Sequence, residues 1–199
     1  IGELLLTGKV NSKKIVSIGG SIIHSENRHL KISRGMLFKD IVRASNAEGY
    51  RIVSGDILSG NSVEKDSSIG YYDDVVTLVK NNFEREFLGW LNPGLNKFSL
   101  SKTFLSSLTP KGVVSLTTSK NGSLRSIVPI GLIEKMCALD IMPTMLIKSI
   151  ISRDIEMMEN LGIYECDPED FGLCTFIDAS KMNISEIIKE GLDYIEVEG

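Results

Sequence analysis

Histidine and cysteine are the side chains of this chain best suited to metal binding or nucleophilic chemistry, and both are scarce. His24 and His29 lie five residues apart in a polar stretch that predicts a loop. A metal pair or an acid–base couple is one interpretation, and two exposed loop histidines are the other. The second is favoured because no third ligand type is spaced with them.

The three cysteines, Cys137, Cys166 and Cys174, are odd in number and contain no Cys-x-x-Cys pair. This pattern does not fit a disulfide framework, and it is typical of a protein in a reducing compartment. It also lacks the closely spaced cysteines that an iron–sulfur cluster needs. We therefore expect buried structural thiols, which pack as small hydrophobic groups.

Polar residues around a glycine turn are the remaining candidates for a site. Arg125 follows Asn121-Gly122-Ser123, where a guanidinium could clamp a carboxylate or a backbone carbonyl at a domain junction. This structural role is favoured over substrate binding. Glu134 and Asp140 follow in the same stretch, and Asp140 is expected to cap a helix that begins at Pro143.

No catalytic or metal-binding residue is predicted. The sequence contains no Gly-x-Gly-x-x-Gly, Walker loop or Gly-x-Ser-x-Gly motif. Methionines are frequent in the second half of the chain, and we expect them to be adaptable core packing rather than a cofactor site. They are Met142, Met145, Met157 and Met158.

Short apolar and β-branched runs in the first 80 residues predict strands around one helix. A helix over residues 35–44 is expected to be capped by Ser33. This succession predicts a small α+β domain of the β-grasp kind. The expected strands are Leu4–Val10, Lys14–Ile18, Tyr50–Val53 and Asp74–Val79.

After Pro129 the apolar spacing becomes helical and predicts a bundle of short helices. Ile130–Leu139 is the first expected helix, and Pro143 occupies a first helical position. Asp154 and Asp167 are expected helix caps, and Asn183 with Glu186 has the spacing of a capping box.

Four segments are expected from this pattern. Residues 1–12 are the end of a truncated upstream domain, because the chain starts on a leucine run. Residues 13–82 form the β-grasp domain, residues 83–128 a connector that contains Trp90, and residues 129–199 the helical bundle. Within the connector, Val113–Leu116 fits either a short strand or an extended arm.

Charge is unevenly distributed along the chain. From Asp154 onward there are 13 acidic residues against two lysines. Such a segment is repelled by phosphates, so nucleic acid is not an expected partner; it is either a solvated surface or a docking face for a basic partner loop. The longest run free of charged residues is residues 15–25, against about 20 apolar residues for a membrane span. Membrane contact is therefore expected through partners.

Three stretches resemble a known family. They are Gly122–Gly131 with the following Glu134–Thr144, the segment Phe87-Leu-Gly-Trp90, and Leu173-Cys-Thr-Phe176. The chain is similar to the C-terminal half of the A subunit of the sodium-translocating NADH:quinone reductase. The turn Val53–Gly60 also resembles soluble-ligand-binding β-grasp modules, although its glycines can equally serve only to permit tight turns.

The resemblance implies a part in electron transfer from NADH through flavins and iron–sulfur centres to ubiquinone, coupled to sodium export. It implies a peripheral position on the cytoplasmic face of the bacterial inner membrane, with the other subunits of the complex as partners. The chain itself is expected to be a scaffold that holds no cofactor and is not catalytic alone. Two alternatives stay open: a β-grasp module that binds quinone or another small ligand, and a relative from an electron-transport complex with clusters upstream.

Overall fold

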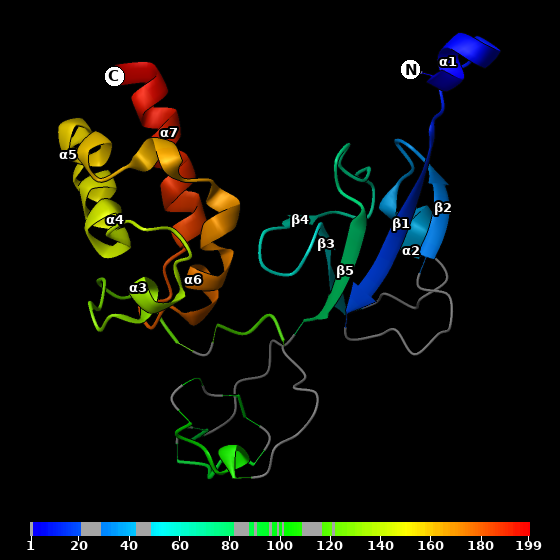
Figure 1. Cartoon of the computed structure of the whole chain (residues 1–199). Helices are drawn as coiled ribbons and strands as arrows, with labels where there is room; N and C mark the ends of the chain where they lie inside the picture. Colours follow the sequence, from blue (N-terminus) through cyan, green and yellow to red (C-terminus); the bar gives the residue numbers. More distant parts are fainter. Residues whose placement is uncertain are drawn as a thin grey trace. The chain divides into compact units, whose positions relative to one another are not determined.

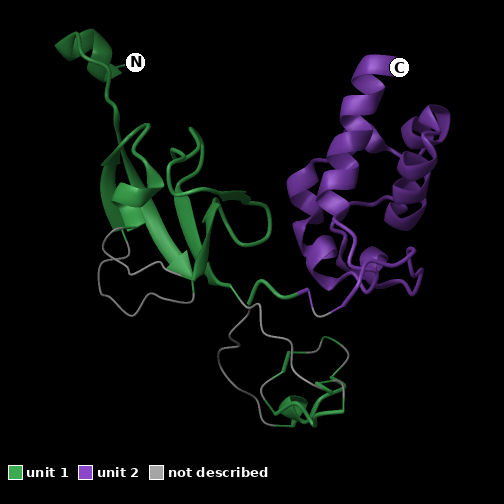
Figure 2. Cartoon of the chain, turned by 180° about the vertical axis from the view of Figure 1, so that it is seen from behind, with its two compact units in different colours: residues 1–119 green, residues 120–199 purple. Residues whose placement is uncertain are grey.

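The computed structural model of the chain describes residues 2–20, 29–42, 49–81, 88–89, 91–95, 97–98, 100, 102–108, 117–120 and 122–199. The chain divides into two compact units, residues 1–119 (unit 1) and 120–199 (unit 2), shown in Figures 1 and 2. Unit 1 is built on a mixed sheet and unit 2 on helices. The predicted α+β class is therefore confirmed. The finer predicted boundaries, at residues 12, 82 and 128, stay predictions.

The sheet of unit 1 has five strands in the order β2-β1-β5-β3-β4. β1 and β5 are parallel, and every other neighbouring pair is antiparallel. A central parallel pair with an antiparallel hairpin on each side is the β-grasp arrangement that the sequence predicts. The strands are β1 (Lys13–Gly20), β2 (His29–Ser33), β3 (Tyr50–Ser54), β4 (Asn61–Val63) and β5 (Val75–Lys80).

Helix α2 (Phe38–Val42) contributes its buried side chains to the core that one face of the sheet forms. Phe38 is fully buried and packs with apolar side chains from one face of the strands. The predicted cap at Ser33 is wrong, because Ser33 ends β2 and pairs with Lys13 of β1. The last residues of the predicted helix, 43–44, lie outside the described residues. The core side chains are Val16, Ile32, Phe38, Ile41, Val42, Ile52, Ile69, Val76 and Leu78.

The segment Leu4–Val10 does not form the predicted strand. Gly2–Thr7 is a short helix, α1, which ends where the amide of Gly8 donates to the carbonyl of Leu4 over 2.8 Å. Gly8 has a φ of 68°, a conformation that commonly ends helices. Leucine has a high helix propensity, and a leucine run alone does not distinguish a short helix from a strand.

The connector contains a short 3-10 helix, η1 (Leu105–Ser107). Its described residues are joined by local hydrogen bonds, such as the 3.0 Å bond from the Leu105 amide to the Pro93 carbonyl. Trp90 and Val113–Leu116 lie outside the described residues, so the choice between a strand and an arm stays open.

Unit 2 packs its short helices around one apolar core. Its helices are α3 (Leu132–Met136), α4 (Pro143–Ser152), α5 (Ile155–Asn160), η2 (Ile163–Glu165), η3 (Pro168–Phe171), α6 (Gly172–Ile177) and α7 (Ile184–Glu198). Leu146, Ile147, Met158, Phe171 and Ile188 are among the fully buried side chains. In the part of the chain that the structure describes, no helix is both long and apolar enough to cross a bilayer.

Two of the five predicted helix caps, those of Asp154 and Asp167, are confirmed. The carboxylate of Asp154 accepts from the Met157 amide at the start of α5, and that of Asp167 accepts from the Glu169 amide at the start of η3. Asn183 is the N-cap of α7, but its side chain makes no capping hydrogen bond. The side-chain amide of Asn183 instead donates to the Glu186 carboxylate over 3.4 Å, so the predicted capping box is wrong.

Candidate functional site

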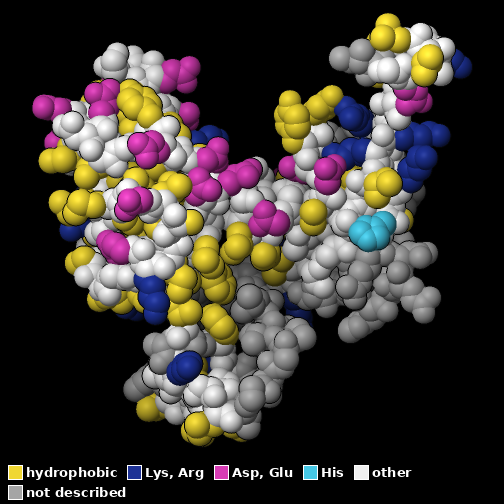
Figure 3. Space-filling view, viewed as in Figure 1, with side chains coloured by type: hydrophobic (Ala, Val, Ile, Leu, Met, Phe, Trp, Pro, Cys, Tyr) yellow, Lys and Arg dark blue, Asp and Glu magenta, His cyan; other side chains and the backbone are white. Residues whose placement is uncertain are grey.

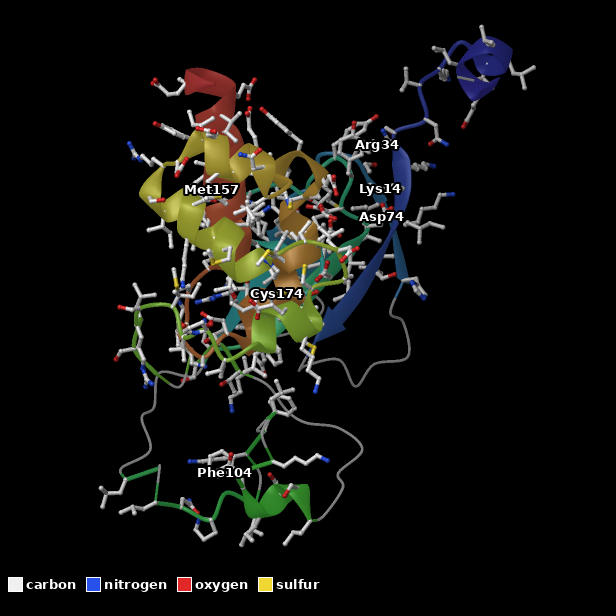
Figure 4. All side chains as sticks on the ribbon, turned by 60° about the vertical axis from the view of Figure 1, so that its left-hand side comes forward. Lys14, Arg34, Asp74, Phe104, Met157 and Cys174 are labelled. Carbon is white, nitrogen blue, oxygen red and sulfur yellow. The ribbon has the colours of Figure 1, made fainter. Side chains whose placement is uncertain are left out.

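Several polar and aromatic side chains of unit 1 lie close together at one end of the β-grasp sheet. β1 and β5 start there, and β2 and β3 end there, as their register requires. Figure 4 places Lys14, Arg34 and Asp74 beside one another at this end. The loops that follow β3 and precede β5 therefore meet here.

Lys14 holds the loop that precedes β5. Its ammonium donates to the carbonyl oxygens of Asp73, Tyr71 and Gly70 at 2.6, 3.2 and 3.4 Å. It also pairs with the carboxylate of Asp74 at 3.2 Å, and the Lys14 side chain is only 8% exposed. A buried ammonium needs such partners because its desolvation is costly. Lys14 therefore fixes the path of residues 70–74.

Ser54 and Asp73 join this loop to the one that follows β3. The Ser54 hydroxyl donates to the Asp73 carboxylate and accepts from the Gly70 amide. A side chain at Gly70 would collide with the Asp73 carboxylate, since an added Cβ would lie 2.3 Å from its oxygen. A side chain at position 70 would therefore displace the Asp73 carboxylate from its place beside Ser54.

Asp56 shapes the turn Val53–Gly60. Its carboxylate accepts from the amides of Leu58 and Ser59 at 2.6 and 3.0 Å, and from the Ser59 hydroxyl. Burial alone would raise the pKa of Asp56, but the hydrogen bonds from Ser59 and Leu58 together outweigh it and lower this pKa. At neutral pH the charged carboxylate therefore orders the turn.

These ordered loops display large side chains to solvent. Tyr71 and Tyr72 are 65% and 88% exposed, and their rings meet edge to face at 5.0 Å. The guanidinium of Arg34 lies 4.5 Å from the centre of the Tyr71 ring. Ile57 and Leu58 are 54% and 44% exposed on the neighbouring turn. We call these five side chains the loop-end surface.

The residue composition of the loop-end surface is typical of a binding site. Tyrosine and arginine are enriched among the residues that dominate binding energy in interfaces. Because the backbone beneath them is already held by Lys14, Ser54 and Asp56, little conformational entropy would be lost on binding. The surface is suited to recognition of a partner or a flat ligand.

The candidates Arg125, Glu134 and Asp140 all lie in unit 2 and are all exposed. Among the described residues, no hydrogen bond or ion pair joins any two of them, so the structure does not assemble them into one site. Asp140 does not cap α4, whose N-cap is Met142 without a side-chain bond, so that interpretation is wrong. Docking roles for the three residues stay predictions.

The contact made by Arg125 is through its backbone. Its amide donates to the Ser180 carbonyl over 2.9 Å, and the Val128 amide donates to the Ser180 hydroxyl over 3.0 Å. Asp178, which is 2% exposed, accepts from the amides of Ser180 and Met182 and so orders this loop. Asp178 and Ser180 were not predicted, although an Asp two residues before a Ser after a helix is a turn signal.

The methionine prediction is only partly right. Met158 is fully buried in the core of unit 2. Met142, Met145 and Met157 are 60%, 45% and 45% exposed, so the interpretation of these three as core packing is wrong. Met145 and Met157 lie on the exposed sides of α4 and α5, and Met142 is the N-cap residue of α4.

The histidine prediction can be followed for one residue. His24 lies outside the described residues. His29 belongs to β2 rather than to a loop, is exposed, and its Nδ1 lies 2.9 Å from the Ser17 hydroxyl on β1. In the described part of the chain, no group of three His, Cys, Asp or Glu side chains is placed to hold a metal ion.

All three cysteines are free thiols. Cys166 and Cys174 are 8% and 0% exposed, which confirms the prediction of buried thiols for these two, and Cys137 packs partly buried against the same core. Burial is the main cause that raises the pKa of Cys166 and of Cys174 to about 11. Neither thiol is therefore suited to act as a nucleophile at neutral pH.

We expect alkylation of Cys166 and Cys174 at pH 8 to be at least about 100-fold slower in the folded chain than in urea. Only the thiolate reacts, and burial in the folded chain raises the pKa of both thiols to about 11. Mass spectrometry of iodoacetamide-treated chain measures this. Unfolded thiols ionise near pH 8.5, so the stability that the buried thiols contribute is complete below that pH and decreases as pH rises towards 11. Equal alkylation rates in the two states would contradict the burial of these thiols.

The fold is thus a β-grasp unit with an ordered, exposed loop end, followed by a small helical unit. Comparison with known proteins then shows similarity along the whole chain to one group of proteins. The chain is 35% identical to the A subunit of the Na(+)-translocating NADH-quinone reductase of Hahella chejuensis, over 100% of this chain and 45% of that protein. It is 36% and 37% identical to the A subunits of the reductases from Shewanella frigidimarina and Shewanella amazonensis, with the same coverage.

The predicted resemblance to a C-terminal part of the A subunit of the Na(+)-translocating NADH-quinone reductase is therefore confirmed. The chain spans about 45% of the length of the curated relatives it matches. No protein-family model matches it.

Proposed function

We propose that the chain is a scaffold and docking part of the A subunit in a sodium-pumping NADH:ubiquinone reductase. The observation that carries this proposal is that the whole chain matches A subunits of Na(+)-translocating NADH-quinone reductases at 34–37% identity. In this proposal the chain lies at the cytoplasmic face of the bacterial inner membrane and contacts the other subunits. NADH, flavins, iron–sulfur centres and ubiquinone belong to the complete enzyme.

The loop-end surface is the proposed docking element. Its support is the combination of exposed tyrosines and an arginine with a backbone held by the hydrogen bonds of Lys14. The chemistry is recognition rather than catalysis: the aromatic rings bury apolar area, and Arg34 offers a guanidinium to a carboxylate or carbonyl of the partner.

We expect the substitution Tyr71→Ala to weaken binding of the chain to the remaining subunits by about 30-fold, the effect of losing a residue that dominates an interface. Tyr164→Ala is the matched control, since Tyr164 is also 65% exposed but lies in unit 2. The measurement is a binding titration of the chain against the detergent-solubilised complex that lacks it. Equal affinities of the two variants would show that the loop-end surface is not the docking element.

The alternative function is binding of quinone or another small flat ligand by the β-grasp unit. The observation in its favour is the exposed tyrosine pair on ordered loops, because aromatic rings can stack on a quinone. Thermal-shift titration with a soluble ubiquinone analogue distinguishes the two functions. A saturable rise in melting temperature, absent in Tyr71→Ala, would favour ligand binding, and no shift at saturation would disfavour it.

A further inference from the structure

Strands β1 and β2 display basic side chains on the face of the sheet opposite the core. Lys13 pairs with Ser33, Ile15 with Lys31, and Ser17 with His29. Directly opposed residues of antiparallel strands project from the same face, at about 5 Å between Cβ atoms. We call this surface the β1–β2 cationic face, and its members are Lys13, Ile15, Ser17, His29, Lys31 and Ser33.

This face lies away from the hydrophobic core. The intervening residues, Val16 and Ile32, are 0% and 5% exposed and belong to the core on the other side. Ile15, in contrast, is 63% exposed between the lysines.

No acidic residue lies within strands β1 and β2 or in the residues next to them along the chain. Residues 8–20 and 29–35 are all described and contain no Asp or Glu. Of their cations, Lys14 is paired with Asp74 and Arg34 lies against the Tyr71 ring of the loop-end surface, which leaves Lys13 and Lys31 on the face and Lys9 shortly before β1. Figure 3 shows Lys and Arg side chains gathered over this part of unit 1, in contrast with the acidic side chains scattered over the helical unit.

The composition of the face favours a lipid headgroup layer over a protein surface. Protein interfaces are depleted in lysine, because burying its strongly hydrated ammonium is costly. Lysines suit anionic headgroups, which remain hydrated, and each contributes about 1 kcal/mol near the surface. A single exposed aliphatic side chain can enter the headgroup layer while the neighbouring ammonium groups stay in water.

We propose that the β1–β2 cationic face binds the anionic surface of a lipid bilayer. The bilayer provides negative charge, and its attraction for the lysines decreases within about 10 Å of the surface, so the charges on this face decide the binding. This contact is direct and does not depend on the docking proposed for the loop-end surface. It revises the expectation that partners alone bring the chain to a membrane.

The test is co-sedimentation of the complete 199-residue chain with vesicles of phosphatidylcholine containing about 30 mol% phosphatidylglycerol, which supplies the anionic headgroups. The variant Lys13→Gln/Lys31→Gln removes two charges from the face. Lys148→Gln/Lys189→Gln removes two charges from exposed lysines of unit 2. Circular dichroism establishes that each variant is folded.

We expect the chain to bind these vesicles at low salt, and to bind pure phosphatidylcholine vesicles much more weakly. The Lys13/Lys31 variant should lower the partition coefficient about 30-fold, at about 1 kcal/mol for each lysine, and the Lys148/Lys189 variant should not lower it. No binding to anionic vesicles would overturn the proposal in favour of an acidic protein surface. Equal losses in the two variants would overturn it as well.

Discussion

Replacement of Phe171 by alanine is expected to destabilise unit 2 by about 3–5 kcal/mol, the usual cost of removing a buried phenylalanine side chain. Phe171 is fully buried where η3 meets α6, and it belongs to the only core of unit 2 within the described residues. A small domain is stable by only about 5–15 kcal/mol. The variant should therefore lose a large part of its stability, measured as the urea midpoint of the helical circular dichroism signal.

Phe176→Ala is the matched control for this substitution. Phe176 lies on α6, five residues further along, and is 42% exposed. Its truncation should cost less than half as much, because less apolar area leaves the protein interior. A similar loss of stability in the two variants would contradict the packing of unit 2.

Gly20→Ala is expected to have a comparable effect on unit 1, about 3–5 kcal/mol from backbone strain and overpacking together. Gly20 has a φ of 119°, a conformation that side chains rarely adopt. An added Cβ would lie 2.0 Å from the carbonyl oxygen of Leu78, its partner on β5. The parallel pair at the centre of the β-grasp would have to separate, and hydrogen exchange of the β5 amides measures the resulting loss of protection.

The neighbouring glycine provides a close control. A Cβ added at Gly19 would meet nothing within 4 Å, and the φ of Gly19 lies outside the left-handed region. Gly19→Ala should therefore leave the protection of β5 nearly unchanged. Protection of β5 that is preserved in Gly20→Ala would show that β1 and β5 are not paired at this point.

The fold could be predicted where the apolar pattern was strong. β-branched runs identified β3 and β5, and the capping acids Asp154 and Asp167 identified the starts of α5 and η3. β2 was missed because its outer face carries His29, Lys31 and Ser33, which read as a loop. Its strand character comes from pairing with β1, a tertiary effect that local sequence does not report.

The candidate site was harder to predict than the fold. The turn Val53–Gly60 was recognised, and its glycines at 55 and 60 are required where the chain folds closely back on itself. Tyr71, Tyr72 and Arg34 were not singled out, because they become neighbours only through the buried Lys14 and its bonds to three carbonyls. Arg125, chosen for its charge, uses its backbone amide instead.

The role proposed for this chain is to dock and support, without a redox group of its own. The measurement that tests this role most directly is the visible absorption spectrum of the purified chain, with metal analysis of the same sample. We predict no flavin or iron–sulfur absorbance and no stoichiometric iron. A chromophore or iron bound at one equivalent per chain would contradict the proposed role.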